Sequence, residues 1–238
     1  MSETLLDEPL RQKVTALQEE LAGIARDHTP VAFANSFGAE DMVLTDVIAR
    51  HGVGIGIFSL DTGRLPAETY EVMQAARNRY QCQIEVFFPE HQAVEAYIGE
   101  HGPNAFYESI ELRKRCCAIR KIEPLKRALS GKKAWITGLR REQSPTRTDV
   151  PFSEWDEANQ LHKFNPLRDW LTDEVWAYIR AFNVPYNALH DKFYPSIGCA
   201  PCTRAITPGE DIRAGRWWWE NPDSRECGLH IKKAASGN

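Results

Sequence analysis

Four of the six cysteines in this chain stand in two close pairs that suit metal or redox chemistry. Cys116 and Cys117 are adjacent, while Cys199 and Cys202 form a CxxC motif, Cys-Ala-Pro-Cys. Without a secretory signal, such patterns favour metal binding or redox chemistry over structural disulfides. Two thiolates from each pair would supply four ligands, the number that a zinc ion or a 4Fe–4S cluster takes. The spacing alone leaves zinc and iron open.

The remaining cysteines differ from these four in their surroundings. Cys227 stands near the C-terminus in the sequence Glu-Cys-Gly-Leu-His, which ends at His230. A thiol beside a glycine, with a histidine nearby, is a candidate nucleophile, and the alternative is a spare exposed thiol. Cys82 has no such company, and we interpret it as a small buried hydrophobic residue.

Three glycine-containing loops each follow an apolar run that is typical of a buried strand. They are Ser36-Phe37-Gly38-Ala39-Glu40-Asp41, the loop Leu60-Asp61-Thr62-Gly63-Arg64, and residues 138–144, which begin Gly138-Leu139-Arg140 and are followed by Arg147. Backbone N–H groups at a helix N-terminus bind anions, although an ordinary strand-to-helix turn would look the same. Three such loops together predict a ligand site at one edge of a sheet.

Strands and helices alternate along the chain, and this alternation positions the three loops. Apolar spacing predicts helices over 4–27, 39–50, 66–80, 111–129 and 172–182, and strands over 31–37, 55–61, 84–88, 133–139 and 162–167. Pro124 should bend or break the fourth helix, and Thr172 is a candidate N-cap for the fifth. We therefore predict an α/β fold with a mostly parallel, doubly wound sheet and an irregular C-terminal tail.

Composition narrows the class of protein further. The 238 residues are 42% hydrophobic and 26% charged, which suits one large α/β domain, and we divide the chain into 1–206 and a tail, 207–238. The net charge of −4 gives no signal for nucleic acid. No stretch reaches the roughly 18 apolar residues of a membrane span, and the N-terminus lacks a secretory signal, so we expect a cytoplasmic protein. Basic residues crowd positions 113–133, as either a solvated helix face or a positive field beside an anionic substrate.

From about Ala34 to His230 the sequence resembles the adenylylsulfate and phosphoadenylylsulfate reductase family. The Glu-Cys-Gly-Leu-His motif at 226–230 is specific to that family, and 36–41 resembles its modified PP-loop, without the double glycine of the related ATP pyrophosphatases. Residues 60–65 and 138–144 match its two other substrate loops. The two cysteine pairs match the branch that carries one 4Fe–4S cluster and prefers adenylylsulfate, so the resemblance selects iron over zinc.

The resemblance implies a fold of the PP-loop, adenine nucleotide alpha hydrolase-like type. It also implies an enzyme of sulfate assimilation and cysteine biosynthesis that reduces adenylylsulfate to sulfite and AMP with thioredoxin or glutaredoxin as electron donor. Catalytic roles would fall to Cys227, Lys121 and His230. Substrate binding would fall to Ser36, Phe37, Gly38, Glu40, Asp41, Leu60, Asp61, Gly63, Gly138, Arg140, Arg147, Arg213 and Arg216.

Several alternatives stay open at this point. Within the same fold, the chain could reduce phosphoadenylylsulfate or accept both nucleotides. A different class is a zinc-stapled nucleotide-binding module without catalysis, which would explain the four paired cysteines but not the motif around Cys227. A PP-loop sulfurtransferase is disfavoured by the missing double glycine. A homo-oligomer is possible.

Overall fold

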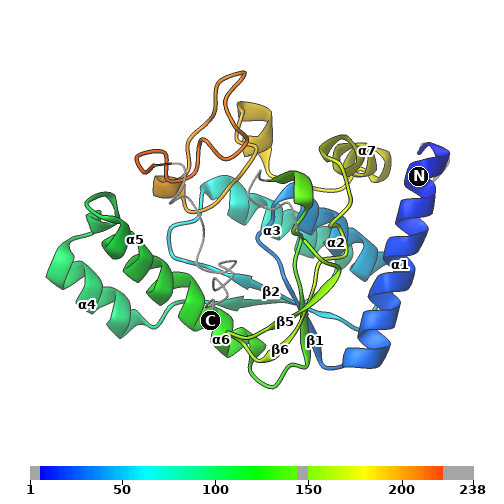
Figure 1. The fold of residues 1–238 in the computed structure, drawn as a ribbon, viewed down its shortest axis with the longest axis horizontal. Helices are drawn as coiled ribbons and strands as arrows, with labels where there is room; N and C mark the ends of the chain where they lie inside the picture. The colour runs from blue at the N-terminus through cyan, green and yellow to red at the C-terminus, as the bar shows by residue number, and fades with distance from the viewer. Residues whose placement is uncertain (1–5, 144–149, 222–238) are drawn as a thin grey trace, which may run out of the picture.

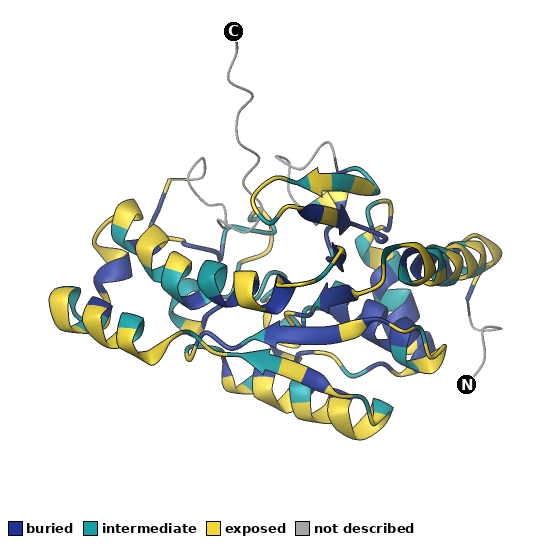
Figure 2. Ribbon diagram, turned by 90° about the horizontal axis from the view of Figure 1, so that it is seen from below, coloured by how far each residue is buried: buried dark blue, intermediate teal, exposed yellow. Residues whose placement is uncertain are grey.

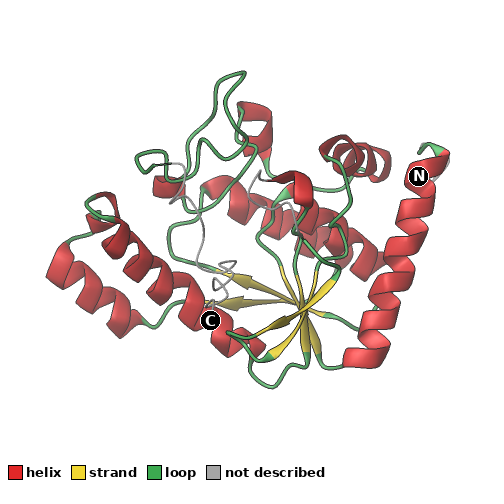
Figure 3. Cartoon of the chain, in the orientation of Figure 1, coloured by secondary structure: helices red, strands yellow, loops and turns green. Residues whose placement is uncertain are grey.

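The computed structural model describes residues 6–143 and 150–221, and its centre is a six-stranded sheet (Figure 1, Figure 3). The strand order is β3-β2-β1-β4-β6-β5, and every neighbouring pair is parallel except β5 with β6. The strands are β1 (Val31–Ala34), β2 (Gly56–Leu60), β3 (Ile84–Phe87), β4 (Ala134–Ile136), β5 (Ser153–Asp156) and β6 (Leu161–Phe164). The predicted mostly parallel α/β sheet is confirmed.

Helices cover both faces of this sheet, so the strands lie buried between two apolar cores (Figure 2). The larger core packs the sheet against α1 (Glu8–His28), α2 (Ala39–Arg50), α3 (Ala67–Tyr80) and α7 (Thr172–Phe182). The smaller core packs Ala32, Phe58 and Trp135 on the other face against α6 (Glu123–Leu129). Because the central strands β1 and β4 are buried on both faces, they are wholly apolar in sequence.

The structure departs from the predicted elements at four places. Helix α4 (His91–His101) and the antiparallel edge strand β5 were not predicted. The predicted helix over 111–129 is divided into α5 (Ile110–Cys117), a π-helical turn (Ala118–Ile122) and α6, and Pro124 lies in the first turn of α6. Thr172 is the first residue of α7 and not its N-cap, which is Leu171; the Thr172 hydroxyl donates to Glu142 instead.

Irregular chain with short helical turns follows α7. The 3₁₀ helices of the described residues are η2 (Ala105–Tyr107), η4 (Arg141–Gln143), η5 (Ala188–Lys192) and η6 (Ala200–Cys202). Thr203 and Arg216 form an isolated antiparallel bridge, and the Trp217 N–H donates to the Cys202 carbonyl, so the described part of 207–238 packs on the segment before it. The boundary at 206 stays a prediction. In the described ranges no helix is long and apolar enough to cross a membrane.

Candidate active site

A cavity of about 260 Å³ lies at the carboxyl ends of β1, β2 and β4. Its wall combines the three loops predicted from the sequence with the segments around 196 and 213 that follow α7. In an open parallel sheet this edge is where ligands bind. The predicted site residues that line the cavity are Ser36, Gly38, Glu40, Asp41, Leu60, Lys121, Gly138, Arg213 and Arg216.

The loop between β1 and α2 is held by its own polar side chains. The backbone N–H and the hydroxyl of Ser36 both donate to Asp41 Oδ2, at 2.7 and 2.6 Å. The Phe37 N–H donates to Asn35 Oδ1 at 2.6 Å, and Phe37 has a positive φ of 61°. These bonds turn the chain sharply, so that the Phe37 side chain is buried in the larger core and does not line the cavity.

Asp41 also joins this loop to the end of β4. Burial raises the pKa of the Asp41 carboxyl to about 6, while hydrogen bonds from Ser36 and from the Gly138 backbone oppose the rise. A Cβ atom on Gly138 would lie 2.2 Å from Asp41 Oδ1. Only glycine therefore lets the two loops approach this closely.

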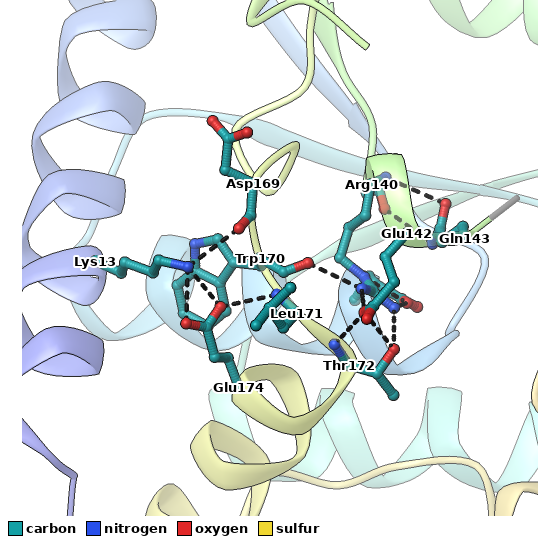
Figure 4. Close-up of polar contacts among 11 residues, drawn as sticks. Lys13, Arg140, Glu142, Gln143, Asp169, Trp170, Leu171, Thr172 and Glu174 are labelled. Atoms are coloured by element: carbon teal, nitrogen blue, oxygen red, sulfur yellow. Dashed lines mark hydrogen bonds and ion pairs between the residues drawn. The ribbon is translucent and has the colours of Figure 1, made fainter. Parts of the chain in front are cut away.

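Arg140, predicted to bind substrate, does not line the cavity and is almost fully buried (Figure 4). Its Nε and Nη2 atoms donate to Glu40 Oε1 at 2.9 and 2.8 Å, and its Nη1 donates to Glu142 Oε2 and to the Trp170 carbonyl, both at 2.9 Å. Thr172 accepts a further bond from Nη2 at 3.2 Å. Arg140 thus fastens the β4 loop to α2 and to the start of α7.

Two predicted residues of the β2 loop also lie outside the cavity lining. Asp61 is buried and accepts hydrogen bonds from the Gly63 N–H at 2.8 Å and from the Tyr70 hydroxyl at 3.0 Å. Burial, together with the Asp61 carboxylate, raises the pKa of Tyr70 to about 12. Asp61 and Gly63 therefore shape the turn, and Leu60 and Thr62 are the loop residues that reach the cavity.

Cations also line this cavity. Lys121 lies in the π-helical turn, and Arg213 and Arg216 lie in the irregular chain that follows α7. Arg216 donates from Nη1 to Ser196 Oγ at 3.3 Å and to the Ile197 carbonyl at 3.2 Å, and its guanidinium stacks 4.8 Å from the Trp217 ring centroid. A Cβ at position 198 would lie 2.3 Å from Arg216 Nη2, so any side chain there would displace the guanidinium.

The four paired cysteines share a second, small cavity of about 20 Å³. The adjacent pair ends α5, where the π-helical turn begins, and the CxxC pair brackets η6. The cavity lining is Arg64, Phe106, Arg113, Cys116, Cys117, Arg120, Lys121, Cys199, Pro201 and Cys202. Cys199 and Lys121 also line the larger cavity, so the two sites adjoin.

Burial and mutual repulsion dominate the electrostatics of the thiols. Burial and the neighbouring cysteines raise the pKa of Cys202 to about 12, and the charges of Lys121 and Arg216 oppose that rise. Burial likewise raises the pKa of Cys116, against the charges of Arg120 and Arg64. Cys199 Sγ lies 3.2 Å from Thr62 Oγ1. Within 6–143 and 150–221 no three Cys, His, Asp or Glu side chains are grouped as ligands of a single metal ion.

A buried ion pair joins the helix that carries Cys116 to the irregular segment. Arg113 donates from Nε and Nη2 to the two carboxylate oxygens of Glu220, at 2.8 and 2.7 Å, and both side chains are almost fully buried. The Arg113 guanidinium also lies 4.9 Å from the Trp217 ring centroid. This contact joins residues more than 100 positions apart in the sequence. It holds the segment that carries Arg213 and Arg216 against the helix that carries Cys116.

Sequence reasoning missed some of the residues that build this site. Thr62 and Arg64 lie within the predicted loop at 60–64, and Arg113 begins the basic run at 113–133, but none of the three was named as a site residue. His190, which also lines the larger cavity, comes from a 3₁₀ helix with no sequence signature. Three predicted residues, Arg147, Cys227 and His230, lie outside the part of the chain that the structure describes.

The fold and the cavity define an α/β protein of the PP-loop, adenine nucleotide alpha hydrolase-like class. Among solved structures, a phosphoadenylyl-sulfate reductase from Candida auris, in a phosphate complex, matches with a TM-score of 0.69 and 25% identity over 84% of this chain and 98% of that one. A Candida glabrata FMN adenylyltransferase, in complex with FMN and an ATP analogue, shares the fold at 14% identity and a TM-score of 0.56, over 92% of this chain and 74% of that one.

Sequence comparisons place the chain in one family of this class. The model of the phosphoadenosine phosphosulfate reductase domain matches residues 30–205, and the chain belongs to this family. It is 58% identical to an adenosine 5'-phosphosulfate reductase of Burkholderia cepacia over 96% of this chain and 91% of the relative. Its identity to the corresponding reductase of Allochromatium vinosum is 53%, over 98% of this chain and 91% of the relative. The family resemblance predicted from the sequence is confirmed.

Proposed function

We propose that this protein reduces adenosine 5'-phosphosulfate to sulfite and AMP, as a step of sulfate assimilation. The observation that carries the proposal is the junction of the two cavities at Lys121 and Cys199. A nucleoside would fit against the loops at the strand ends, while the phosphosulfate dianion would face Lys121, Arg213 and Arg216. The names of the Burkholderia and Allochromatium relatives support the same substrate.

In the first step the Cys227 thiolate attacks the sulfur of adenosine 5'-phosphosulfate. A sulfur–sulfur bond forms, the sulfur–oxygen bond to the phosphate breaks, and AMP leaves with the electron pair. The enzyme then carries an S-sulfocysteine at position 227. A thiolate is required because it is the nucleophilic form, and cations near the reacting sulfur favour it. His230, in the same motif, would assist at this end of the substrate.

The second step takes two electrons from a protein dithiol of the thioredoxin or glutaredoxin class. One thiolate of that donor attacks the Cys227 sulfur, sulfite leaves, and a mixed disulfide forms. The second donor thiol attacks the mixed disulfide, which releases Cys227 as a thiol and oxidises the donor to its disulfide. The donor is thus oxidised by two electrons, which are the two electrons that reduce the sulfate group to sulfite.

The four-cysteine cavity fits one 4Fe–4S cluster held by Cys116, Cys117, Cys199 and Cys202, because it offers four sulfur ligands and lining cations. With all its protein ligands in place, the cluster would supply charge beside the substrate and fix the two cysteine segments together. Lys121, which lines both cavities, would then place its positive charge between the anionic cluster and the phosphosulfate. A Lys121→Ala enzyme should lose turnover while it keeps its iron.

Mass spectrometry after incubation with adenosine 5'-phosphosulfate, without any reductant, tests the central step. The expected product is the intact chain with one added SO₃ group on Cys227, and a Cys227→Ser enzyme should carry none. The Cys82→Ser enzyme is the matched control, since Cys82 packs against the larger core and should leave the adduct unchanged. An unmodified chain from an enzyme with a full complement of iron would refute the mechanism.

Two alternatives, one for the substrate and one for the cofactor, can each be tested by one measurement. The family model and the Candida auris structure are named for phosphoadenylylsulfate, so kcat/KM should be compared for that nucleotide and for adenosine 5'-phosphosulfate. A higher kcat/KM for phosphoadenylylsulfate would replace the proposed substrate. Metal analysis after anaerobic purification separates the cluster from a zinc staple, because a colourless protein with zinc and no iron would replace the proposed cofactor.

A further inference from the structure

The guanidinium of Arg64 lines the four-cysteine cavity, and one of its nitrogen atoms has no hydrogen-bond acceptor among the described residues. This atom is Nη1, which is fully buried. Two other cations of this lining have defined partners: Arg113 forms the bidentate pair with Glu220, and Arg120 donates to the Thr62 carbonyl at 2.6 Å. No described carboxylate forms a salt bridge with Arg64.

The backbone of Arg64 is fixed between the two segments that build the cavity. Its N–H donates to Thr62 Oγ1 at 3.2 Å, and the same oxygen lies 3.2 Å from Cys199 Sγ. Its carbonyl accepts from the Ala200 N–H, inside the CxxC motif, at 2.8 Å. The guanidinium stacks on Phe106 with 4.9 Å from Cζ to the ring centroid. The side chain is therefore held in place at the cavity from both ends.

A buried donor without an acceptor is unfavourable, because folding removes its hydrogen bond to water and no protein acceptor replaces it. Among the described residues, the lining of the cavity offers sulfur atoms and cations as neighbours and contains no carboxylate. The chemistry that satisfies such a guanidinium is an anionic, sulfur-rich group held by the four cysteines. Hydrogen bonds to sulfur and nearby positive charge are also the means by which proteins tune such groups.

We propose that Arg64 is a positioning residue that donates a hydrogen bond and a positive charge to the four-cysteine centre and raises its reduction potential. The inference rests on the proposed function, because it takes the bound group to be a 4Fe–4S cluster. One-electron reduction adds a negative charge to that centre, and a buried cation stabilises the reduced form more than the oxidised form. Loss of Arg64 therefore lowers the potential.

The test compares the midpoint potential of the anaerobically purified wild type with that of Arg64→Met, measured by dye-mediated titration with EPR detection. Reduction should become about tenfold less favourable in Arg64→Met, which is a fall of about 59 mV for one electron. Arg64→Lys keeps the charge and should fall less. Arg115→Met is the matched control, since Arg115 precedes Cys116 but pairs with Glu100 on the surface, outside the cavity, and should stay near the wild-type potential.

Iron content is measured for every variant, so that loss of the centre is not mistaken for a shift in its potential. If Arg64→Met loses its iron, the comparison moves to Arg64→Gln and Arg64→Lys, and the neutral glutamine variant should have the lower potential. Equal potentials in variants with full iron would overturn the role of Arg64 alone. A wild-type protein without an iron–sulfur centre would overturn the proposed cofactor and the inference with it.

Discussion

The two walls of the larger cavity use charge in opposite ways. On the strand-end wall, which is formed by the loops at 36–41, 60–64 and 138–143, charged groups pair with other protein groups. Glu40 and Glu142 pair with the buried Arg140 behind the wall, and Asp41 accepts hydrogen bonds from Ser36. The second wall, which we call the cysteine wall, is formed by Lys121, Arg213 and Arg216 together with Cys199. Its cations line the cavity itself. The difference agrees with the proposed orientation of the substrate, in which the uncharged nucleoside faces the first wall and the phosphosulfate faces the second.

The walls also differ in how they are held together. Short-range bonds turn the strand-end loops, such as Phe37 N–H to Asn35 and Gly63 N–H to Asp61. The cysteine wall depends on the Arg113–Glu220 pair, whose partners are 107 residues apart. One wall can therefore form with its own strands, while the other forms only when distant segments meet. Substitutions should separate the two walls by the size of their effects.

The largest effect should follow from removal of one charge of the buried pair. Glu220→Gln leaves the Arg113 guanidinium buried without its counter-ion, and this should lower the free energy of unfolding by about 3–5 kcal/mol. Urea unfolding, followed by circular dichroism, measures the change. The control is Glu100→Gln, which removes an exposed partner of Arg115 and should cost less than about 1 kcal/mol. Equal losses in the two variants would mean that the buried pair does not hold the cysteine wall.

Asp41 gives the strand-end wall a pH dependence that the cysteine wall need not share. Its folded-state pKa of about 6 exceeds the ordinary value of 3.8, so the folded protein binds this proton more tightly than the unfolded chain. The stability that this provides is fully present below about pH 4 and is lost as the pH rises through about 6. The loss amounts to about 3 kcal/mol over that window.

An Asp41→Asn variant should lack this fall, because its side chain does not titrate. Unfolding free energies at pH 4 and at pH 6.5 should differ less in the variant than in the wild type, by an amount of this order. Asp27→Asn is a suitable control, since Asp27 is exposed and pairs with Arg26 on the surface. If the wild type and Asp41→Asn show the same pH dependence, then Asp41 is charged in the folded protein and the loop junction is described wrongly.

The close approach of the two strand-end loops can be broken with one methyl group. Gly138→Ala places a Cβ at 2.2 Å from Asp41 Oδ1, so the loops must separate. The expected cost is about 1–3 kcal/mol of stability, with weaker binding of AMP by calorimetry. Gly99→Ala is the control, because a Cβ there meets nothing within 4 Å and alanine favours helix α4. Unchanged AMP affinity in Gly138→Ala would mean that the nucleotide does not bind in this cavity.

The same contrast explains how much of the molecule could be predicted from its sequence. The alternation of strands and helices and the three glycine loops follow from local patterns, and the structure brings all three loops to one cavity. The pairing of the two cysteine motifs followed from the number of ligands, and both line one cavity. Arg140 does not line the cavity, and a basic residue in a loop carries no local sign that Glu40, 100 residues earlier, will bind it; its role in substrate binding stays a prediction.

The loop that contains Thr62 and Arg64 was predicted to form part of the site, but the individual contacts of these two residues could not be predicted. Their roles depend on a CxxC segment that is more than 130 residues away and that packs against the β2 loop only in the folded chain. The edge strand β5 was missed because its residues, Ser153–Asp156, are polar and half exposed, so they lack the apolar run that marks the buried strands. Local patterns locate the loops and the cysteine pairs, but not the long-range contacts that hold individual side chains within them.

The smallest expected effect tests whether the β2 loop belongs to both walls. Thr62→Val keeps the shape of the side chain but removes the oxygen that contacts Cys199 Sγ and accepts from the Arg64 N–H. The loss of these weak contacts should cost about 1 kcal/mol in urea unfolding. In the control, Thr15→Val, the lost hydroxyl donates to a carbonyl on the exposed surface of α1, and the cost should be near zero. A loss in Thr62→Val no larger than in Thr15→Val would show that the β2 loop is held by Arg120 and the backbone alone, and that the two walls are independent at this point.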